Sequence, residues 1–120
     1  MGLFRDAVAE IGAQPPPDVP AGYSLFRFLD SGAFRALLEG AGLKDVTVTE
    51  HPATHRAPDM DTLWRGGLGS FAVTASAIGY QDVATQAKIR VAIERLAQPY
   101  MTADGLLLPV AFRIAAGVRR

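Results

Sequence analysis

Hydrophobic residues recur at helical spacing in two segments of the first third of the chain. Residues 3–12 place leucine, phenylalanine, alanine, valine and isoleucine on one face, which predicts a short amphipathic helix. Residues 31–41 repeat this pattern, and Asp30 or Ser31 supplies the oxygen that caps the helix start. The 13–22 segment between them holds four of the eight prolines, so we expect a proline-rich, extended connector there.

The pattern changes from helix to strand after Gly42, whose position suits a left-handed cap at the end of the second helix. Residues 46–49 alternate valine with threonine, which is typical of a strand. Pro52 either limits this strand or places it at a sheet edge, because proline cannot donate a ladder hydrogen bond. We expect residues 51–61 to form a loop.

The middle of the chain returns to helical spacing. Apolar residues fall on one helix face over residues 64–78, and Asp59 or Asp61 is the candidate N-cap. A second helix follows over residues 83–98, after a break at residues 79–82. Three glycines in the first of these helices weaken it or divide it into two pieces. They are Gly66, Gly67 and Gly69.

The last segment alternates between two sets of side chains. Asp104 and Gly105 signal a turn, and residues 108–116 follow as a strand. Both faces of this strand are small or apolar except at Arg113, so we expect it to be covered on both sides. The prediction is a single domain of helix, connector, helix, strand, two helices and strand. Two strands are marginal in water, so an unrecognised strand near residues 25–29, a second copy or a missing partner must complete the sheet.

Composition narrows the function classes. Across 120 residues, 12 basic and 12 acidic side chains balance, 49% of residues are hydrophobic and the mean hydropathy is +0.16. A neutral chain with scattered basic residues lacks the electrostatic footprint of a nucleic-acid-binding protein, and its apolar content excludes a disordered tail. The absence of cysteine excludes disulfides, thiolate nucleophiles and zinc–thiolate sites. No signal-peptide pattern or apolar run of about 20 residues is present, so we expect a cytoplasmic protein with no membrane segment.

The two histidines, His51 and His55, are the side chains best suited to proton transfer near neutral pH. Their four-residue spacing would align them on a helix, but Pro52 lies between them, so we expect no metal site here. The alternative is that both histidines are polar residues of a solvated loop. Four aromatic side chains can wall an apolar ligand cavity or simply fill the core. They are Tyr23, Phe26, Trp64 and Phe71.

Three segments together resemble the C-terminal part of a class I S-adenosylmethionine-dependent methyltransferase. The stretch SLFRFLDSGAFRALLEGAGLKDVTVTE resembles the late helix of that family, its Leu-Leu-x-x-Ala-Gly-Leu exit and the sixth strand. Residues 57–99 resemble the helical, cap-like insertion that covers the substrate, and DGLLLPVAFRIAAGVR resembles the antiparallel seventh strand. The resemblance implies an α/β fold that is a partial Rossmann-like methyltransferase fold, with two strands in an antiparallel pair and helices between them.

The chain departs from that family at the methyl-donor site. The family binds its cofactor in the first half of the fold, with a strand, a glycine-rich turn of the G-x-G-x-G type and an acidic residue ending the next strand. The nearest match, Gly67-Leu68-Gly69, follows a helical pattern, and we interpret it as helix packing or a break in the helix. The resemblance therefore implies a substrate-side half without its cofactor-binding half, and no cofactor bound by this chain.

The function expected from the resemblance is the substrate-binding cap region of a small-molecule methyltransferase that is not catalytic by itself. The resemblance places His55 and Arg56 beside the substrate, with His55 as a candidate base for the methyl acceptor. The other substrate-binding candidates are Tyr23, Trp64 and Phe71. The alternative is a stand-alone dimeric module that binds a small ligand or a protein. The expected partners are accordingly a small molecule and either a second copy or the missing half, and whether the chain is itself an enzyme stays open.

Overall fold

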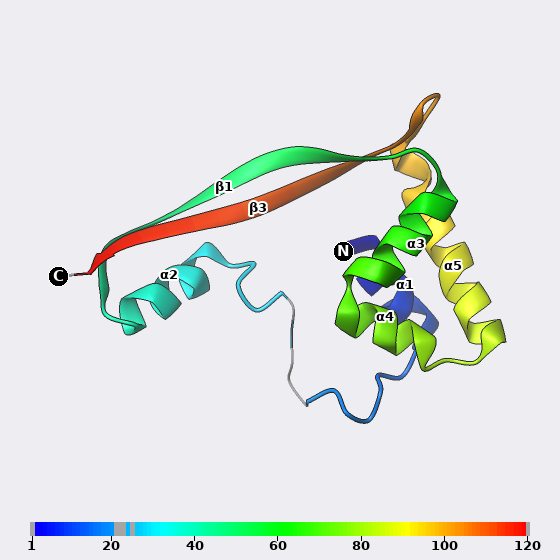
Figure 1. The fold of residues 1–120 in the computed structure, drawn as a ribbon, viewed down its shortest axis with the longest axis horizontal. Coiled ribbons are helices and arrows are strands. Elements are labelled where there is room, and N and C mark those ends of the chain that lie inside the picture. Colours follow the sequence, from blue (N-terminus) through cyan, green and yellow to red (C-terminus); the bar gives the residue numbers. More distant parts are fainter. Residues whose placement is uncertain (1, 21–23, 25, 120) are drawn as a thin grey trace. The chain divides into compact units, whose positions relative to one another are not determined.

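The computed structural model describes residues 2–20, 24 and 26–119, and it combines helices with a small antiparallel sheet (Figure 1). The mixed α/β class predicted from the sequence is confirmed at this level. The elements in chain order are α1 (Gly2–Ile11), α2 (Ser31–Gly40), β1 (Leu43–Ala57), α3 (Met60–Ser70), α4 (Ala72–Gly79), α5 (Val83–Ala97), the 3-10 helix η1 (Gln98–Tyr100), β2 (Met101–Thr102) and β3 (Gly105–Arg119). The connector between α1 and α2 has no helix or strand in its described residues.

Three helices begin at an aspartate whose side chain accepts a backbone hydrogen bond. Asp30 accepts from the N–H of Ala33 at 2.7 Å, Asp59 from that of Thr62 at 2.6 Å, and Asp82 from that of Thr85 at 2.7 Å. Each bond satisfies one of the N–H groups that lack a partner in the first turn. The predicted caps at Asp30 and Asp59 are confirmed.

These caps make the helical segments sensitive to acid. The hydrogen bond from the backbone of Thr85 holds the pKa of Asp82 below its ordinary value, and the backbone of Thr62 does the same for Asp59. A pKa lowered by folding stabilises the protein above the unfolded pKa, near 3.8, and this contribution is lost as the pH falls through the folded pKa.

We therefore expect Asp82→Asn to flatten the fall in stability below about pH 4, because asparagine accepts the same hydrogen bond but does not titrate. Urea unfolding at a series of pH values measures the effect. Asp18→Asn is the matched control, since Asp18 is exposed and lies outside the helices and strands. Equal pH profiles for Asp82→Asn and wild type would contradict the assigned role of the cap.

The sheet has the strand order β1-β3-β2. β2 pairs antiparallel with β3 through Met101 with Leu106 and Thr102 with Gly105, around the turn that Asp104 and Gly105 predicted. The short strand β2 has no counterpart in the sequence prediction, which placed two strands in the chain. The two-strand prediction is therefore corrected to three strands. The proposed extra strand near residues 25–29 is not found, because residues 26–28 form a turn, while Leu25 lies outside the described residues.

The loop expected over residues 51–61 is wrong for its first seven residues. β1 continues through Pro52 to Ala57 and is fifteen residues long. Since β1 lies at the edge of the sheet in the described part of the chain, the missing N–H of Pro52 need not interrupt the pairing with β3. The second reading of Pro52, as an edge residue, is the one the structure supports.

The chain divides into two compact units, which are described separately here. We call them the helical unit (Met1–Ala21 and His55–Leu108) and the ribbon unit (Gly22–Thr54 and Pro109–Arg120). In the helical unit, α1 packs against α5 and α4 around a buried apolar cluster. The cluster consists of Phe4, Ala7, Ile78, Ile89, Ala92 and Ile93. A smaller cluster joins β3 to the end of α5, and consists of Ala57, Ala97, Leu106 and Leu108.

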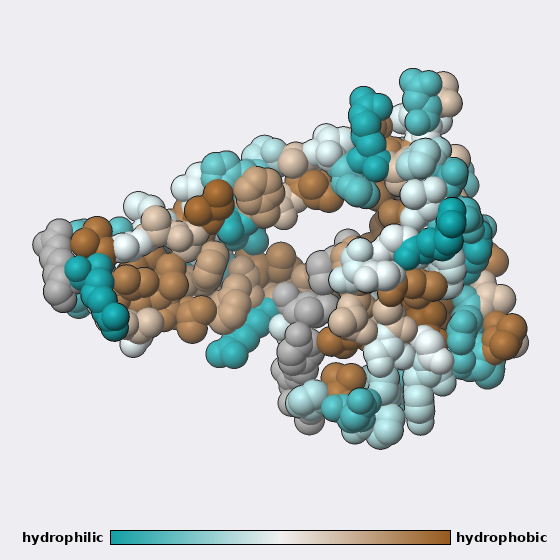
Figure 2. Space-filling view, in the orientation of Figure 1, coloured by the Kyte–Doolittle hydropathy of each residue, from teal (hydrophilic) through white to brown (hydrophobic). Residues whose placement is uncertain are grey.

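The ribbon unit contains α2 and the long antiparallel run of β1 beside β3, and it buries little. Among its described hydrophobic residues only Val46 is buried. A row of apolar side chains along β3 is instead 41% to 53% exposed, so the prediction that β3 is covered on both faces is wrong for the chain by itself. The row consists of Val110, Phe112, Ile114 and Val118. Figure 2 shows hydrophobic side chains gathered on the surface of this unit.

Candidate functional site

Two of the predicted substrate-binding residues, Trp64 and Phe71, lie in the helical unit in contact with Phe4. The rings of Phe4 and Trp64 are stacked with their centroids 6.1 Å apart, and Phe71 meets Phe4 edge-on at 5.6 Å. Phe4 is almost fully buried, while Trp64 and Phe71 are half-buried at the border of the core. Both rings therefore pack against Phe4, and their contacts are those of a packed core.

A glycine makes this packing possible. Gly67 lies on α3 directly against the Phe4 ring, and a Cβ atom at Gly67 would stand 2.5 Å from Cε1 and 2.7 Å from Cε2 of that ring. Gly66 and Gly69 face open space. α3 runs through all three glycines and ends at Ser70, so the break that the glycines suggested falls after them, at Phe71. Gly67 thus has a packing role that the sequence could not distinguish from that of its neighbours.

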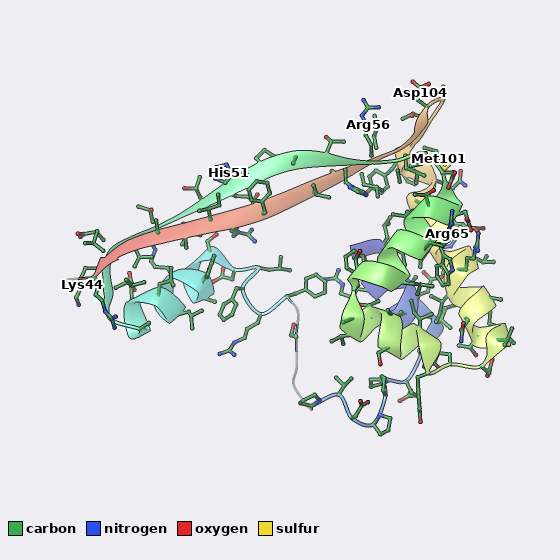
Figure 3. All side chains as sticks on the ribbon, in the orientation of Figure 1. Lys44, His51, Arg56, Arg65, Met101 and Asp104 are labelled. Carbon is green, nitrogen blue, oxygen red and sulfur yellow. The ribbon has the colours of Figure 1, made fainter. Side chains whose placement is uncertain are left out.

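His55 and Arg56 are exposed residues of β1. Because neighbouring strand residues point to opposite faces, these two side chains diverge. Figure 3 shows Arg56 projecting outward from the strand. Among the described residues no hydrogen bond, ion pair or ring contact joins either of them to Trp64 or Phe71, and Tyr23 lies outside the described residues. The structure thus brings together only the two aromatic members of the predicted site.

A shallow groove on the helical unit was not predicted. It encloses about 360 Å³ between α1 and α5, and its floor is apolar. Its rim carries Lys88 and the ion pair between Glu10 and Arg95. The sequence signal for it is an apolar row on the outer face of α5, in which Val91 is 63% exposed. The groove is open to solvent.

The ribbon unit holds a polar contact on one face and a ring stack on the other. Arg113 forms an ion pair with Glu50 and donates a hydrogen bond to the hydroxyl of Ser31 at 3.1 Å. This face of β3 is the one that α2 approaches. On the opposite face, the imidazole of His51 stacks on Phe112 with the ring centroids 5.3 Å apart. Glu50 thus supplies the carboxylate that pairs with the guanidinium of Arg113.

No group of three potential metal ligands is present among the described residues, and no helix in that part of the chain is long and apolar enough to cross a membrane. The sequence matches no known family model and no curated protein. Functional inference therefore rests on the chain's own geometry.

Proposed function

We propose that this chain is the substrate-side, C-terminal part of a small-molecule methyltransferase that uses S-adenosylmethionine, and that it is not catalytic by itself. The observation that carries the proposal is the order of the elements. β1 and β3 are antiparallel neighbours in the sheet, α2 precedes β1 in the sequence, and the helices α3 to α5 lie between the two strands in the sequence. This is the order in which the family it resembles places its sixth strand, its helical cap and its closing seventh strand.

The glycine pair nearest to a cofactor loop supports the second part of the proposal. Gly67-Leu68-Gly69 lies inside α3, and the ring of Phe4 packs against Gly67. A cofactor loop needs glycines in a turn between a strand and a helix, where backbone N–H groups approach the ligand. The methyl donor is accordingly held by a part of the enzyme other than these residues.

Under this proposal the helical unit covers the methyl acceptor. Its aromatic border at Trp64 and Phe71 supplies apolar contact area, and Arg90 lies over the Trp64 ring at 5.8 Å from its centroid. An exposed His55 near the start of these helices remains the candidate base for the acceptor's proton. The substrate class that fits such a border is a small, largely apolar molecule.

Calorimetric titration with S-adenosylmethionine tests the proposal. We expect no binding heat from the 120-residue chain. The same chain expressed together with the coding stretch that precedes it, when that stretch encodes a strand and a glycine-rich turn, is expected to bind one equivalent. Stoichiometric binding by the 120-residue chain alone would contradict the proposal, as would an upstream stretch that encodes neither element.

A second function, a stand-alone module that dimerises, is favoured by one observation. The ribbon unit exposes an apolar row that a single copy of its described residues does not cover. A module of this kind would not require methyltransferase activity.

A further inference from the structure

One side of β3 pairs with no other described strand over most of its length. In the described part of the chain, β1 lies along one side of β3, and β2 pairs with the other side only at Gly105 and Leu106. From residue 107 to 119 that second side meets no described strand. An open strand edge presents alternating N–H and C=O groups that pair readily with another strand.

The ribbon unit also lacks the strands that a stable sheet requires. Two strands are marginal in water, whereas three or more with an apolar face are stable. Here two long strands and α2 surround a single buried hydrophobic residue, Val46, among the described residues. Pairing two copies through β3 makes a four-stranded sheet in the order β1-β3-β3-β1. The two-stranded ribbon of one copy thereby becomes half of a four-stranded sheet.

The edge has few of the features that prevent strands from pairing. Natural edges are guarded by charged side chains, bulges or prolines. Between residues 107 and 119 the charged residues are Arg113 and Arg119, and the guanidinium of Arg113 is already paired with Glu50. Pro109 stands near one end of the segment and leaves residues 110–119 open to pairing.

The sequence of β3 is complementary to itself when the strand is reversed about Ile114. Opposed residues in an antiparallel pair share a face, so a two-fold axis perpendicular to the sheet must pass through a residue position. With Ile114 on the axis, Phe112 faces Ala116, Arg113 faces Ala115 and Val110 faces Val118. Phe112 and Arg113 then oppose alanines, Val110 and Ile114 oppose β-branched residues, and no two arginines face each other. An axis at Arg113 would instead set that charge against itself, which is destabilising.

We propose that β3 pairs antiparallel with β3 of a second copy of this chain, with Ile114 on the two-fold axis. The partner is thus an identical strand, recognised by main-chain hydrogen bonds and by the pairing of Phe112 and Arg113 with alanines. This inference goes beyond the methyltransferase proposal and does not rest on it. If a cofactor-binding half is present, it competes for the same edge.

Single-cysteine variants test the register, because the chain has no cysteine of its own. At the axis, two copies of Ile114 stand about 4.5–5.5 Å apart between Cα atoms, within the range of a disulfide. Two copies of Phe112 are offset by four residues, about 13 Å along the strand. Ile114→Cys should therefore form a covalent dimer under mild oxidation and Phe112→Cys should not. The two positions are equally exposed, at 53%, so reactivity alone cannot separate them.

Sedimentation equilibrium tests the dimer itself. We expect the wild-type chain to sediment with the mass of two chains and Ile114→Lys with that of one, because two lysines then face each other on the axis. Val83→Lys, the same kind of change at an 83% exposed residue of the helical unit, should remain dimeric. Circular dichroism checks that each variant is folded.

Two outcomes overturn the proposal. One is a wild-type chain that stays monomeric across the whole concentration range. The other is equal disulfide formation at positions 112 and 114, which indicates random collision. Neither outcome touches the titration with S-adenosylmethionine, so failure of the dimer and failure of the methyltransferase proposal are distinguishable. If the 120-residue chain dimerises but the extended chain is monomeric, the cofactor-binding half takes the edge in the longer protein.

Discussion

Replacing Gly67 with alanine is expected to lower the free energy of unfolding of the helical unit by about 2 kcal/mol. The new methyl group would overlap the ring of Phe4, which is 2% exposed and in contact with both Trp64 and Phe71. Overpacking of this kind costs about 3 kcal/mol, and alanine's higher helix propensity returns about 1 kcal/mol. Urea unfolding followed by the fluorescence of Trp64, the sole tryptophan, measures the change.

Gly66 provides the matched control, because it is the adjacent residue of α3 and faces open space. Gly66→Ala should stabilise the same unit by up to about 1 kcal/mol. Phe4→Leu combined with Gly67→Ala should recover part of the loss, since the smaller side chain relieves the overlap and the two sites are in contact. Equal urea midpoints for Gly66→Ala and Gly67→Ala would show that Phe4 does not pack against α3 as described.

Replacing Gly105 with alanine should cost about 3 kcal/mol, through backbone strain and overlap together. Gly105 has a φ of +106°, which residues with a Cβ atom rarely adopt. A Cβ atom there would also lie 2.5 Å from the carbonyl oxygen of Ala57 and 2.7 Å from that of Pro58. Backbone carbonyls cannot rotate away as a side chain can, so the turn between β2 and β3 must distort. Amide hydrogen exchange at Leu106 measures the loss.

A substitution at Gly42 separates the cost of backbone strain from the cost of overlap. Gly42 has a φ of +87° but open space around it, so Gly42→Ala should lose only the conformational part, about 1 kcal/mol, read from amide exchange at Val46. The excess cost at Gly105 then measures the overlap with the two carbonyls. If both substitutions cost the same, the close approach of β3 to the Ala57–Pro58 backbone is not present in solution.

The packing of Phe4 bears on the proposed function. A substrate-covering unit needs apolar side chains at its border, and Trp64 and Phe71 are half-buried there. Both rings already pack against Phe4, so a substrate must bind on the parts of these rings that Phe4 leaves exposed or displace Phe4. Destabilising substitutions at Gly67 and at Gly105 therefore act on the part of the chain that the methyltransferase proposal assigns to the substrate.

Much of the secondary structure could be predicted from local patterns. The helix over residues 31–41, its Asp30 cap and the left-handed Gly42 are confirmed, because each depends on residues within a turn or two of one another. The same holds for the breaks around α4 and the turn before β3. Of the candidate site, the sequence named Trp64 and Phe71 as aromatic residues that wall a cavity or fill the core, but it did not indicate that both contact Phe4.

The sequence by itself determined the order of the main helices and the two long strands, the caps at Asp30 and Asp59 and the left-handed glycine at position 42, since these follow from local conformational preference. Only the tertiary structure decided the roles that depend on distant residues. Pro52 is part of a long strand because β3 pairs with β1, Gly67 is special because Phe4 packs on it, and Arg113 is neutralised because Glu50 lies beside it. Patterns of apolar spacing predict which side chains can be buried, but contacts between residues far apart in the chain decide which of them are buried.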